Sequence, residues 1–147
     1  MTVTVKPFGE LTASEVYEIL KARCDIFTVE QQICYPDMDD IDYDAIHVFC
    51  ADGRGVVQAY LRLYTEGADQ GTVHIGRVLT RDHGMGLGRV VMEEGIRVAF
   101  GHMGAARILL HSQEDCIGFY EKFGFRVVSD VFIEAEIPHV EMIMDRI

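Results

Sequence analysis

The chain has 147 residues, of which 49% are hydrophobic and 25% charged, and these values predict one folded domain over residues 1–147 rather than a disordered chain. Thirteen lysines and arginines against 24 aspartates and glutamates give a formal net charge of −11, which disfavours binding to nucleic acid. Because no apolar run reaches the roughly 18 residues of a membrane-spanning helix, and the N-terminus lacks a signal peptide's apolar block, we expect a cytoplasmic protein with no membrane partner.

The first part of the chain predicts a strand, a helix, a long loop and a hairpin. Residues 2–8 alternate like a strand, and Thr12-Ala13-Ser14-Glu15 has the pattern of a capping box before an apolar stripe that predicts a helix over 13–28. Residues 30–46 are polar and contain five aspartates, and a connection of this length is often a binding loop. Two strands, 47–50 and 56–64, then flank a glycine-containing turn.

The rest of the chain alternates strands and helices. We expect a strand over 73–79, then a glycine cluster that leads into a helix ending near Gly101 or Gly104. The remaining segments are a strand at 107–111, a helix at 115–123 closed by Gly124, and strands at 125–133 and 140–144. This order predicts an α/β or α+β domain around one mixed sheet.

The cysteines and histidines do not have the spacing of a metal site. Four cysteines are scattered without a C-x-x-C pair, and the six histidines form no metal-type doublet. We therefore expect free thiols and no metal.

A glycine-rich turn is the most informative feature of the sequence. Glycines let a ligand approach the main chain, and the N-terminus of the following helix offers unpaired N–H groups and a partial positive charge. This combination predicts a phosphate or pyrophosphate site. A plain strand-to-helix turn is the alternative, whereas the Lys of a Walker A loop and the acidic residue of a Rossmann fingerprint are missing. The residues of the predicted site are Gly84, Met85, Gly86, Leu87, Gly88 and Arg89.

This turn resembles the acyl-CoA pyrophosphate loop of the GNAT superfamily of N-acyltransferases, whose pattern is Arg/Gln-x-x-Gly-x-Gly/Ala. In one register, Arg81, Gly84 and Gly86 match the pattern literally. In the other, His83, Gly86 and Gly88 match it, with histidine at the basic position. We favour the second register because the apolar stripe of the helix then falls where that of the family does.

A second motif follows in the order and spacing of the same family. Residues 113–125 resemble its Asn-x-x-Ala-x-x-x-Tyr-x-x-x-Gly-Phe, with Gln113 for Asn and Cys116 for Ala. Further likeness at 23–31, 75–78 and 137–139 points to the ElaA-like branch and extends the resemblance to nearly the whole chain. It implies the GNAT fold: one mixed, mostly antiparallel sheet of six to seven strands, splayed between the fourth and fifth strands and flanked by about four helices.

The resemblance also implies a reaction. Acetyl-CoA would donate its acetyl group to a primary amine by direct attack. Main-chain amides at Val78, Leu79 and Thr80 would hold the pantetheine and polarise the thioester, and Gln113 would add a cofactor contact. Tyr120 would protonate the CoA thiolate, because a phenol is largely protonated at pH 7; the alternative is that Tyr120 only packs in the core. A non-catalytic acyl-CoA-binding module or sensor is the competing function.

The acceptor side is less defined. The candidate substrate-binding residues are Glu30, Gln31, Asp39, Arg77 and His139. The general base remains open among Glu30, Asp39, His74 and His139. Arg77 would pair with Glu30 or clamp an acceptor carboxylate, and the aspartates of 30–46 would be solvated or attract a cationic amine. The acceptor would be a small molecule or peptide, and an exposed last strand would be a candidate to pair across a homodimer.

Overall fold

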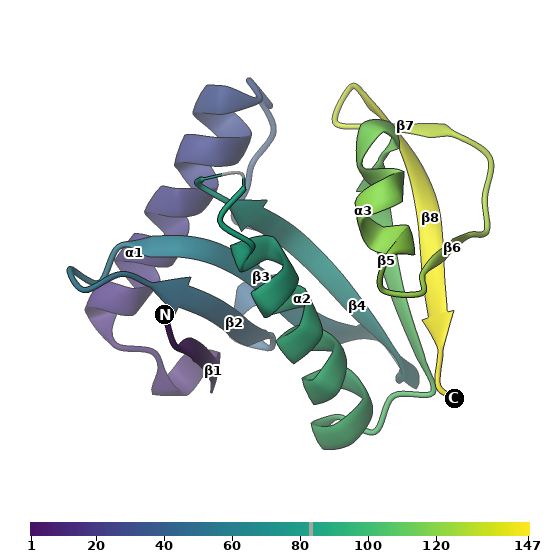
Figure 1. Ribbon diagram of the computed structural model, residues 1–147, viewed down its shortest axis with the longest axis horizontal. Helices are drawn as coiled ribbons and strands as arrows, with labels where there is room; N and C mark the ends of the chain where they lie inside the picture. Colours follow the sequence, from purple (N-terminus) through teal and green to yellow (C-terminus); the bar gives the residue numbers. More distant parts are fainter. Residues whose placement is uncertain (83) are drawn as a thin grey trace.

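The fold is built on one mixed sheet with the strand order β1-β2-β3-β4-β5-β8-β6, and β7 lies beside β8 (Figure 1). The computed structural model describes residues 1–82 and 84–147, so His83 is outside the described residues. Neighbouring strands are antiparallel except β4 and β5, which are parallel. The strands in the described chain are β1 (Val3–Pro7), β2 (Ile46–Ala51), β3 (Val57–Glu66), β4 (Asp69–Thr80), β5 (Arg107–Gln113), β6 (Arg126–Val127), β7 (Phe132–Glu134) and β8 (Ile137–Asp145).

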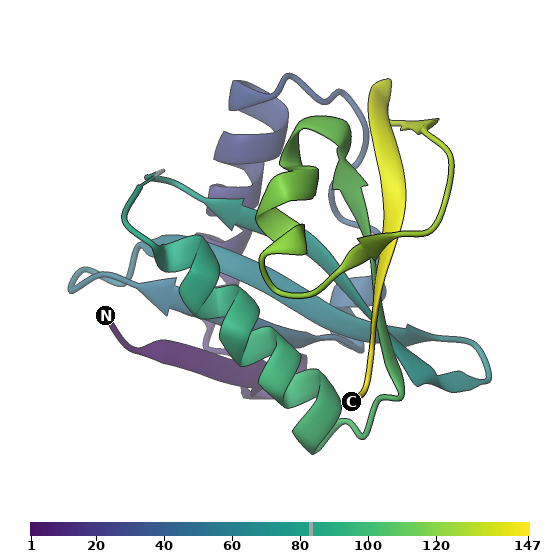
Figure 2. The same ribbon diagram turned by 45° about the vertical axis from the view of Figure 1, so that its right-hand side comes forward.

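Helices cover both faces of the sheet, with α1 on one face and α2 and α3 on the other (Figures 1 and 2). The α-helices of the described residues are α1 (Ala13–Arg23), α2 (Leu87–Arg97) and α3 (Ile117–Glu121). Two π-helical segments extend the first two, η2 (Cys24–Glu30) and η4 (Val98–His102). Short 3-10 turns complete the set, η1 (Phe8–Glu10), η3 (Ile41–Tyr43) and η5 (Glu114–Cys116). Both expected helices are therefore present. The helix expected at 13–28 continues from α1 into the π-helical η2, and the one expected at 115–123 begins as the 3-10 turn η5 and continues as α3.

The start of α1 is the predicted capping box. The Glu15 amide donates to Thr12 Oγ1 at 3.1 Å, and the Thr12 amide donates to Glu15 Oε1 at 2.9 Å. The same carboxylate accepts from Lys6 Nζ at 2.9 Å, which ties the first turn of α1 to β1.

Alternation along the central strands builds two cores. On β3, Leu61 and Leu63 pack with the α2 side of the sheet, whereas Tyr60, next to Leu61, packs with α1. Period-2 alternation of a strand places its side chains on opposite faces in this way. Each fully buried leucine contributes roughly 1.5–3 kcal/mol to folding, so Leu61 and Leu63 help to fix α2 to the sheet that carries the site.

The sheet opens between β4 and β5, as the resemblance implies. The two strands pair only from Thr72 to Ile75 on β4 and from Arg107 to Leu110 on β5. Beyond these pairs β4 continues to Thr80 and β5 to Gln113, and the strands diverge (Figures 1 and 2). On its other side β4 shifts register against β3 around Arg77, whose φ of 54° is left-handed. A bulge of this kind re-aims the strand at the point where it leaves its neighbour.

Two expectations about the end of the chain are wrong. The predicted strand over 125–133 is broken into β6 and β7, because the Glu141 amide of β8 bonds the Ser129 side chain instead of a main-chain partner and the segment leaves the sheet there. The last strand is not exposed, since β5 lies on one side of β8 and β6 and β7 lie on the other. Among the described residues, no helix combines the length and apolar character needed to cross a bilayer.

Candidate functional site

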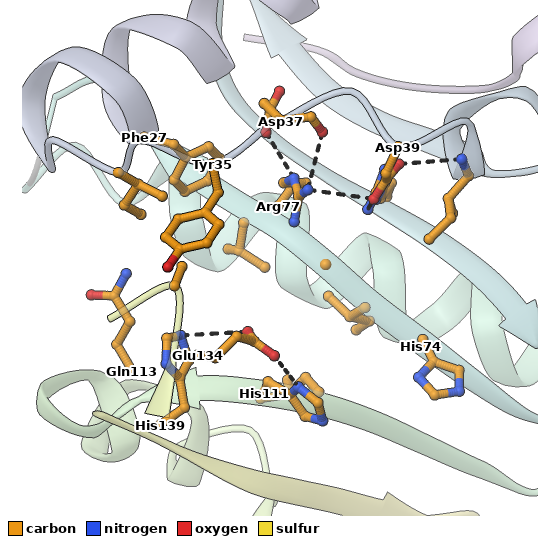
Figure 3. Close-up of a pocket in the computed structure, with 18 of the residues that line it drawn as sticks. Phe27, Tyr35, Asp37, Asp39, His74, Arg77, His111, Gln113, Glu134 and His139 are labelled. Atoms are coloured by element: carbon orange, nitrogen blue, oxygen red, sulfur yellow. Dashed lines mark hydrogen bonds and ion pairs between the residues drawn. The ribbon is translucent and has the colours of Figure 1, made fainter. Parts of the chain in front are cut away.

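A cavity of about 790 Å³ occupies the opening between β4 and β5 (Figure 3). Its walls come from η2, the loop of residues 31–44, β4, β5, α3 and the β7–β8 hairpin. This volume is within the range of small-molecule sites in proteins. The predicted site residues that line it are Gln31, Asp39, Arg77, Val78, Gln113, Tyr120 and His139. The fold therefore brings together residues that are far apart in the sequence.

Three arginines and three aspartates anchor the 31–44 loop, and four of them, Arg62, Arg77, Asp37 and Asp39, line the cavity. Arg23 is 0% exposed and contacts Asp37 and Asp42, each at 2.7 Å. Arg62 is 2% exposed and contacts Asp39 at 2.6 Å and Asp42 at 3.0 Å. Buried guanidinium groups need such partners, because an unpaired buried charge is strongly destabilising. We call this set of six, which Arg77 completes, the Arg–Asp network.

Arg77 connects the Arg–Asp network to the bulge of β4. Its Nε lies 2.8 Å from Asp37 Oδ1, and its Nη2 lies 3.4 Å from Asp39 Oδ2 (Figure 3). Arg77 therefore forms ion pairs with Asp37 and Asp39, two partners that the sequence analysis did not name. The pairing of three of the five aspartates also overturns the expectation of a solvated acidic run.

The network makes Asp39 a weak base. Burial acts in the opposite direction, but hydrogen bonds from Arg62 hold the pKa of Asp39 below its ordinary value. The pKa of Asp42 is lowered in the same way, with Arg23 as the main donor. Carboxylates that stay ionised in two ion pairs are poorly suited to take up a proton near neutral pH.

The opposite wall carries two histidines with a glutamate between them. His139 Nδ1 lies 2.7 Å from the Ile137 carbonyl oxygen, and its Nε2 lies 3.7 Å from Glu134 Oε2. The other carboxylate oxygen lies 2.9 Å from His111 Nδ1 (Figure 3). The hydrogen bond with Glu134 raises the pKa of His111, and the reciprocal bond lowers the pKa of Glu134.

Sequence reasoning missed His111 and Glu134. The sequence analysis gives His111 only as the last residue of a strand, and Glu134 directly follows the strand expected at 125–133. The sequence held no clear signal for Glu134, because the two-residue turn at Ala135 and Glu136 lacks the glycine or asparagine that marks such a hairpin.

One hydrogen bond joins the two sides of the opening. Gln113 Nε2, at the end of β5, donates to Gln31 Oε1, at the end of η2, at 2.9 Å. These residues were predicted separately as a cofactor contact and a substrate contact. Tyr35, which the sequence did not suggest, points from the 31–44 loop toward the wall of His139 (Figure 3). The mouth of the cavity is therefore narrowed by neutral polar groups.

Tyr120 packs its ring in the core and is also one of the residues that line the cavity. The residue is 8% exposed, and its ring centroid lies 5.0 Å from that of Phe119 and 6.2 Å from that of Phe125. It lines the cavity one helical turn after Cys116. Within the described residues its hydroxyl meets no hydrogen-bond partner, and burial raises its pKa. The phenol therefore remains protonated and free to donate at neutral pH.

The glycine loop lies outside this cavity, at the start of α2. Gly84 and Gly86 have φ values of 105° and 75°, and a Cβ at either would meet no heavy atom of the described chain within 4 Å. Gly86 is the N-cap of α2 and offers no side-chain cap. At Gly88, by contrast, a Cβ would lie 3.2 Å from Thr80 Cγ2 and 3.4 Å from Phe119 Cζ. The first two glycines leave open space at the helix N-terminus, and the third lets α2 pack against the end of β4.

The two cationic candidates next to the loop differ in how they are held. Arg81 donates from Nε to the Val57 carbonyl and from Nη1 to Asp25, both at 2.8 Å. Two nitrogens of its guanidinium group are thus engaged on β3 and η2, and His83, the other candidate for the basic position, lies outside the described residues. Arg89, in the first turn of α2, has a largely exposed side chain that pairs with Glu93.

Other predicted residues have a mainly structural position. Leu79 is 3% exposed and belongs to the core on the α1 side. Glu30 ends η2 and does not line the cavity, whereas His74 lines it and stacks on Tyr64 with ring centroids 5.1 Å apart. In the part of the chain that the structure describes, no group of three or more His, Cys, Asp or Glu side chains could hold a metal ion.

Known proteins resemble this chain in sequence over most of its length. The model of the acetyltransferase (GNAT) family matches residues 15–125. A UPF0039 protein of Schizosaccharomyces pombe is 36% identical over 140 residues, which are 93% of this chain and 92% of that protein. Protein ElaA of Escherichia coli is 33% identical over 138 residues, 91% of this chain and 90% of its own.

Solved structures agree with these likenesses. The crystal structure of an acyl-CoA N-acyltransferase from Pseudomonas aeruginosa has a TM-score of 0.88 and 32% identity, and the match covers 97% of this chain and 99% of that one. The crystal structure of Escherichia coli ElaA has a TM-score of 0.90 and 29% identity, with 98% and 99% covered. The family match includes the glycine loop and Tyr120, whereas His139 lies beyond it.

Proposed function

This chain belongs to the acetyltransferase (GNAT) family, and from that premise we propose that it transfers the acetyl group of acetyl-CoA to a primary amine. Membership makes acyl transfer from an acyl-CoA the general reaction. The acetyl group, the amine acceptor and the role of each residue are the finer parts of the proposal.

The open N-terminus of α2 supports the diphosphate part of the donor site. The left-handed Gly84 and Gly86 expose main chain where the helix presents its first N–H groups. No acidic residue occupies the first turn, and Arg89 adds a cation there. In the proposal, main-chain amides of residues 84–89 bind the diphosphate, with His83 or Arg81 at the basic position of the motif.

The divergence of β4 from β5 supports the position of the thioester. Past the bulge at Arg77, the main chain of Val78 and Leu79 no longer has β5 as a neighbour. Amides in such a position can hold the pantetheine and polarise the thioester oxygen, and Thr80 continues the same edge. Gln113 limits the opening from the side of β5.

Direct attack forms the C–N bond at the thioester carbon and breaks the C–S bond. The electron pair of that bond goes to sulfur, and Tyr120 supplies the proton that converts the thiolate to CoA thiol. Its place in the lining of the cavity, a hydroxyl free of protein partners in the described chain and a raised pKa support this role. General acid catalysis of this kind contributes typically 10²–10⁴-fold to a rate.

The observation that carries the proposal is the opening of the sheet beyond Ile75 and Leu110, which puts Tyr120 on a cavity walled by both strands. The test measures release of free CoA from acetyl-CoA with a panel of primary amines: spermidine, kanamycin, glycine and a short peptide with a free N-terminus. We expect release that depends on the amine. Binding of acetyl-CoA without release in the presence of any amine would instead favour the non-catalytic module.

A further inference from the structure

The cavity wall formed by His139, Glu134 and His111 has no role in the donor chemistry described above. We propose that His139 is the general base that takes a proton from the acceptor ammonium, and that Glu134 and His111 form the path by which this proton reaches solvent. This inference rests on the proposed function, because it assigns the acceptor half of the same reaction.

The hydrogen bond of His139 to its own strand fixes which nitrogen is basic. A carbonyl oxygen only accepts, so Nδ1, at 2.7 Å from the Ile137 oxygen, carries a hydrogen. In the neutral ring the lone pair is then on Nε2, the nitrogen near Glu134. His139 lines the cavity and its side chain is only 9% exposed. A group bound in the cavity can therefore reach this side chain, whereas bulk water has little access to it.

The other candidate bases are less suitable. Asp39 is committed to Arg62 and Arg77, and Glu30 does not line the cavity. His74 has its Nε2 3.8 Å from Glu66, near the β3–β4 turn and away from Gln113 at the mouth (Figure 3).

Both Glu134 and His111 are more exposed than His139. The side chain of Glu134 is 48% exposed and that of His111 is 39% exposed, against 9% for His139. Glu134 contacts one histidine with each of its carboxylate oxygens, at 3.7 and 2.9 Å. Glu134 therefore lies between the two imidazoles and can pass a proton from one to the other.

The charged groups around the path come from four strands. Glu134 is on β7, His111 on β5 and Glu141 on β8. Arg77, on β4 across the cavity, helps to lower the pKa of Glu134 through its positive charge. Glu141 Oε1 lies 3.5 Å from the outer nitrogen of His111, so a second carboxylate supports the protonated form of that ring. The phenol of Tyr35 faces this wall from the loop (Figure 3).

The backbone of the β7–β8 hairpin supports a specific function for Glu134. The turn residues Ala135 and Glu136 have φ values of 50° and 66°, where glycine or asparagine is favoured. Strained residues persist where the surroundings require them, often at functional sites. Phe132, on the same hairpin, packs its ring on both His111 and His139, which holds the two imidazoles on either side of the carboxylate.

The proton count of the reaction balances. The ammonium nitrogen loses two protons as it becomes an amide. The first goes to His139 Nε2 and leaves through Glu134 and His111 to solvent. The second replaces the proton that Tyr120 gives to sulfur. The net products are the amide, CoA thiol and one proton in solution.

The test is the pH dependence of kcat/KM in three variants of the full chain, with acetyl-CoA and the best amine of the panel. His139→Asn should lower kcat/KM by about 10²–10³-fold with unchanged acetyl-CoA affinity. Glu134→Gln removes a negative charge 3.7 Å from His139 Nε2, so the acidic limb of the profile should move to lower pH by about 0.5–1 unit. His111→Gln removes a cation beside Glu134, so the limb should move to higher pH.

Glu136→Gln is the matched control, because it removes a carboxylate from the same hairpin but outside the proposed proton path. The acidic limb of its kcat/KM profile should stay at the wild-type pH. Opposite shifts for the two neighbours of one histidine are not produced by simple loss of structure. Two results would overturn the inference while the wild type remains active, which leaves the proposed function standing. One is a normal rate in His139→Asn. The other is an acidic limb in Glu134→Gln and His111→Gln that lies at the same pH as in the wild type. A wild type inactive with every amine would remove both.

Discussion

Single side chains decide the chemistry of this site, because the cavity itself is only a space between two strands. Tyr120 and His139 stand on different walls, one from α3 and one from β8, and both line the same cavity. Both were predicted from motifs in the sequence. His111 and Glu134 were not, because contacts made through a turn depend on the register of the hairpin, which the sequence analysis did not identify.

Removal of one oxygen tests the role of Tyr120. Tyr120→Phe should lower kcat by about 10²-fold or more, while the affinity for acetyl-CoA stays the same, because the ring still packs against Phe119 and Phe125. Steady-state release of CoA and calorimetric titration give the two values. A variant with the wild-type kcat would remove Tyr120 from the mechanism.

A charge placed at the helix N-terminus tests the diphosphate site. Gly86→Glu should abolish acetyl-CoA binding, because a side chain and a negative charge would enter the open space in front of α2 and left-handed Gly86 does not favour a Cβ. Gly101→Glu is the control, since it adds the same charge beyond the far end of α2, where a Cβ also meets no described atom. Equal affinity in the two variants would place the diphosphate elsewhere.

At the scale of elements, the 31–44 loop is a surface connection that two buried arginines, Arg23 and Arg62, hold in place. Its sequence indicated a binding loop, and the loop does line the cavity. The sequence could not show that its aspartates pair with Arg23 and Arg62, because the partners are 14 to 23 positions apart and come together only when α1 and β3 pack. His47 adds to this, with Nε2 2.9 Å from the Asp42 carbonyl oxygen.

Asp42→Asn tests the contribution of the Arg–Asp network. Loss of the carboxylate leaves Arg23 and Arg62 buried with one partner fewer, which should cost about 2–3 kcal/mol of unfolding free energy at neutral pH. The pKa of Asp42 is lowered in the folded state, so its contribution is complete above the ordinary value near 3.8 and is lost as pH falls through the lowered pKa.

Urea unfolding of Asp42→Asn, the wild type and Asp44→Asn from neutral pH down to about pH 3 measures this difference. Asp44 is exposed in the same loop, so its variant should match the wild type. A difference between wild type and Asp42→Asn that stays constant as the carboxylates become protonated would contradict the electrostatic explanation.

The β7–β8 hairpin makes a second prediction at this scale. Glu136→Gly places glycine at a φ of 66° and should raise the unfolding free energy by about 0.5–1 kcal/mol, because relief of the left-handed strain exceeds the entropy that glycine adds to the unfolded chain. Chemical denaturation gives the value. A lower stability would mean that the turn is not strained.

Over the whole molecule, the order of elements and the mixed sheet followed from periodicity and turn residues, and the splay followed from the family resemblance. Sequence reasoning failed where pairing leaves the regular pattern. Residues 125–133 have the composition of one strand, but Ser129 takes up the Glu141 amide with its side chain and divides them. The interior position of β8 likewise depends on two short strands that fold back beside it.

The central claim is that an acyl-CoA is held by its diphosphate at the N-terminus of α2, with the thioester directed into the opening between β4 and β5. Calorimetric titration of the full chain with acetyl-CoA and, in parallel, with S-acetylpantetheine, which lacks the diphosphate, tests it most directly. We expect acetyl-CoA to bind at least about 100-fold more tightly, since several charge-assisted hydrogen bonds are lost with the diphosphate. Equal affinities, or no binding of acetyl-CoA at millimolar concentration, would contradict the claim.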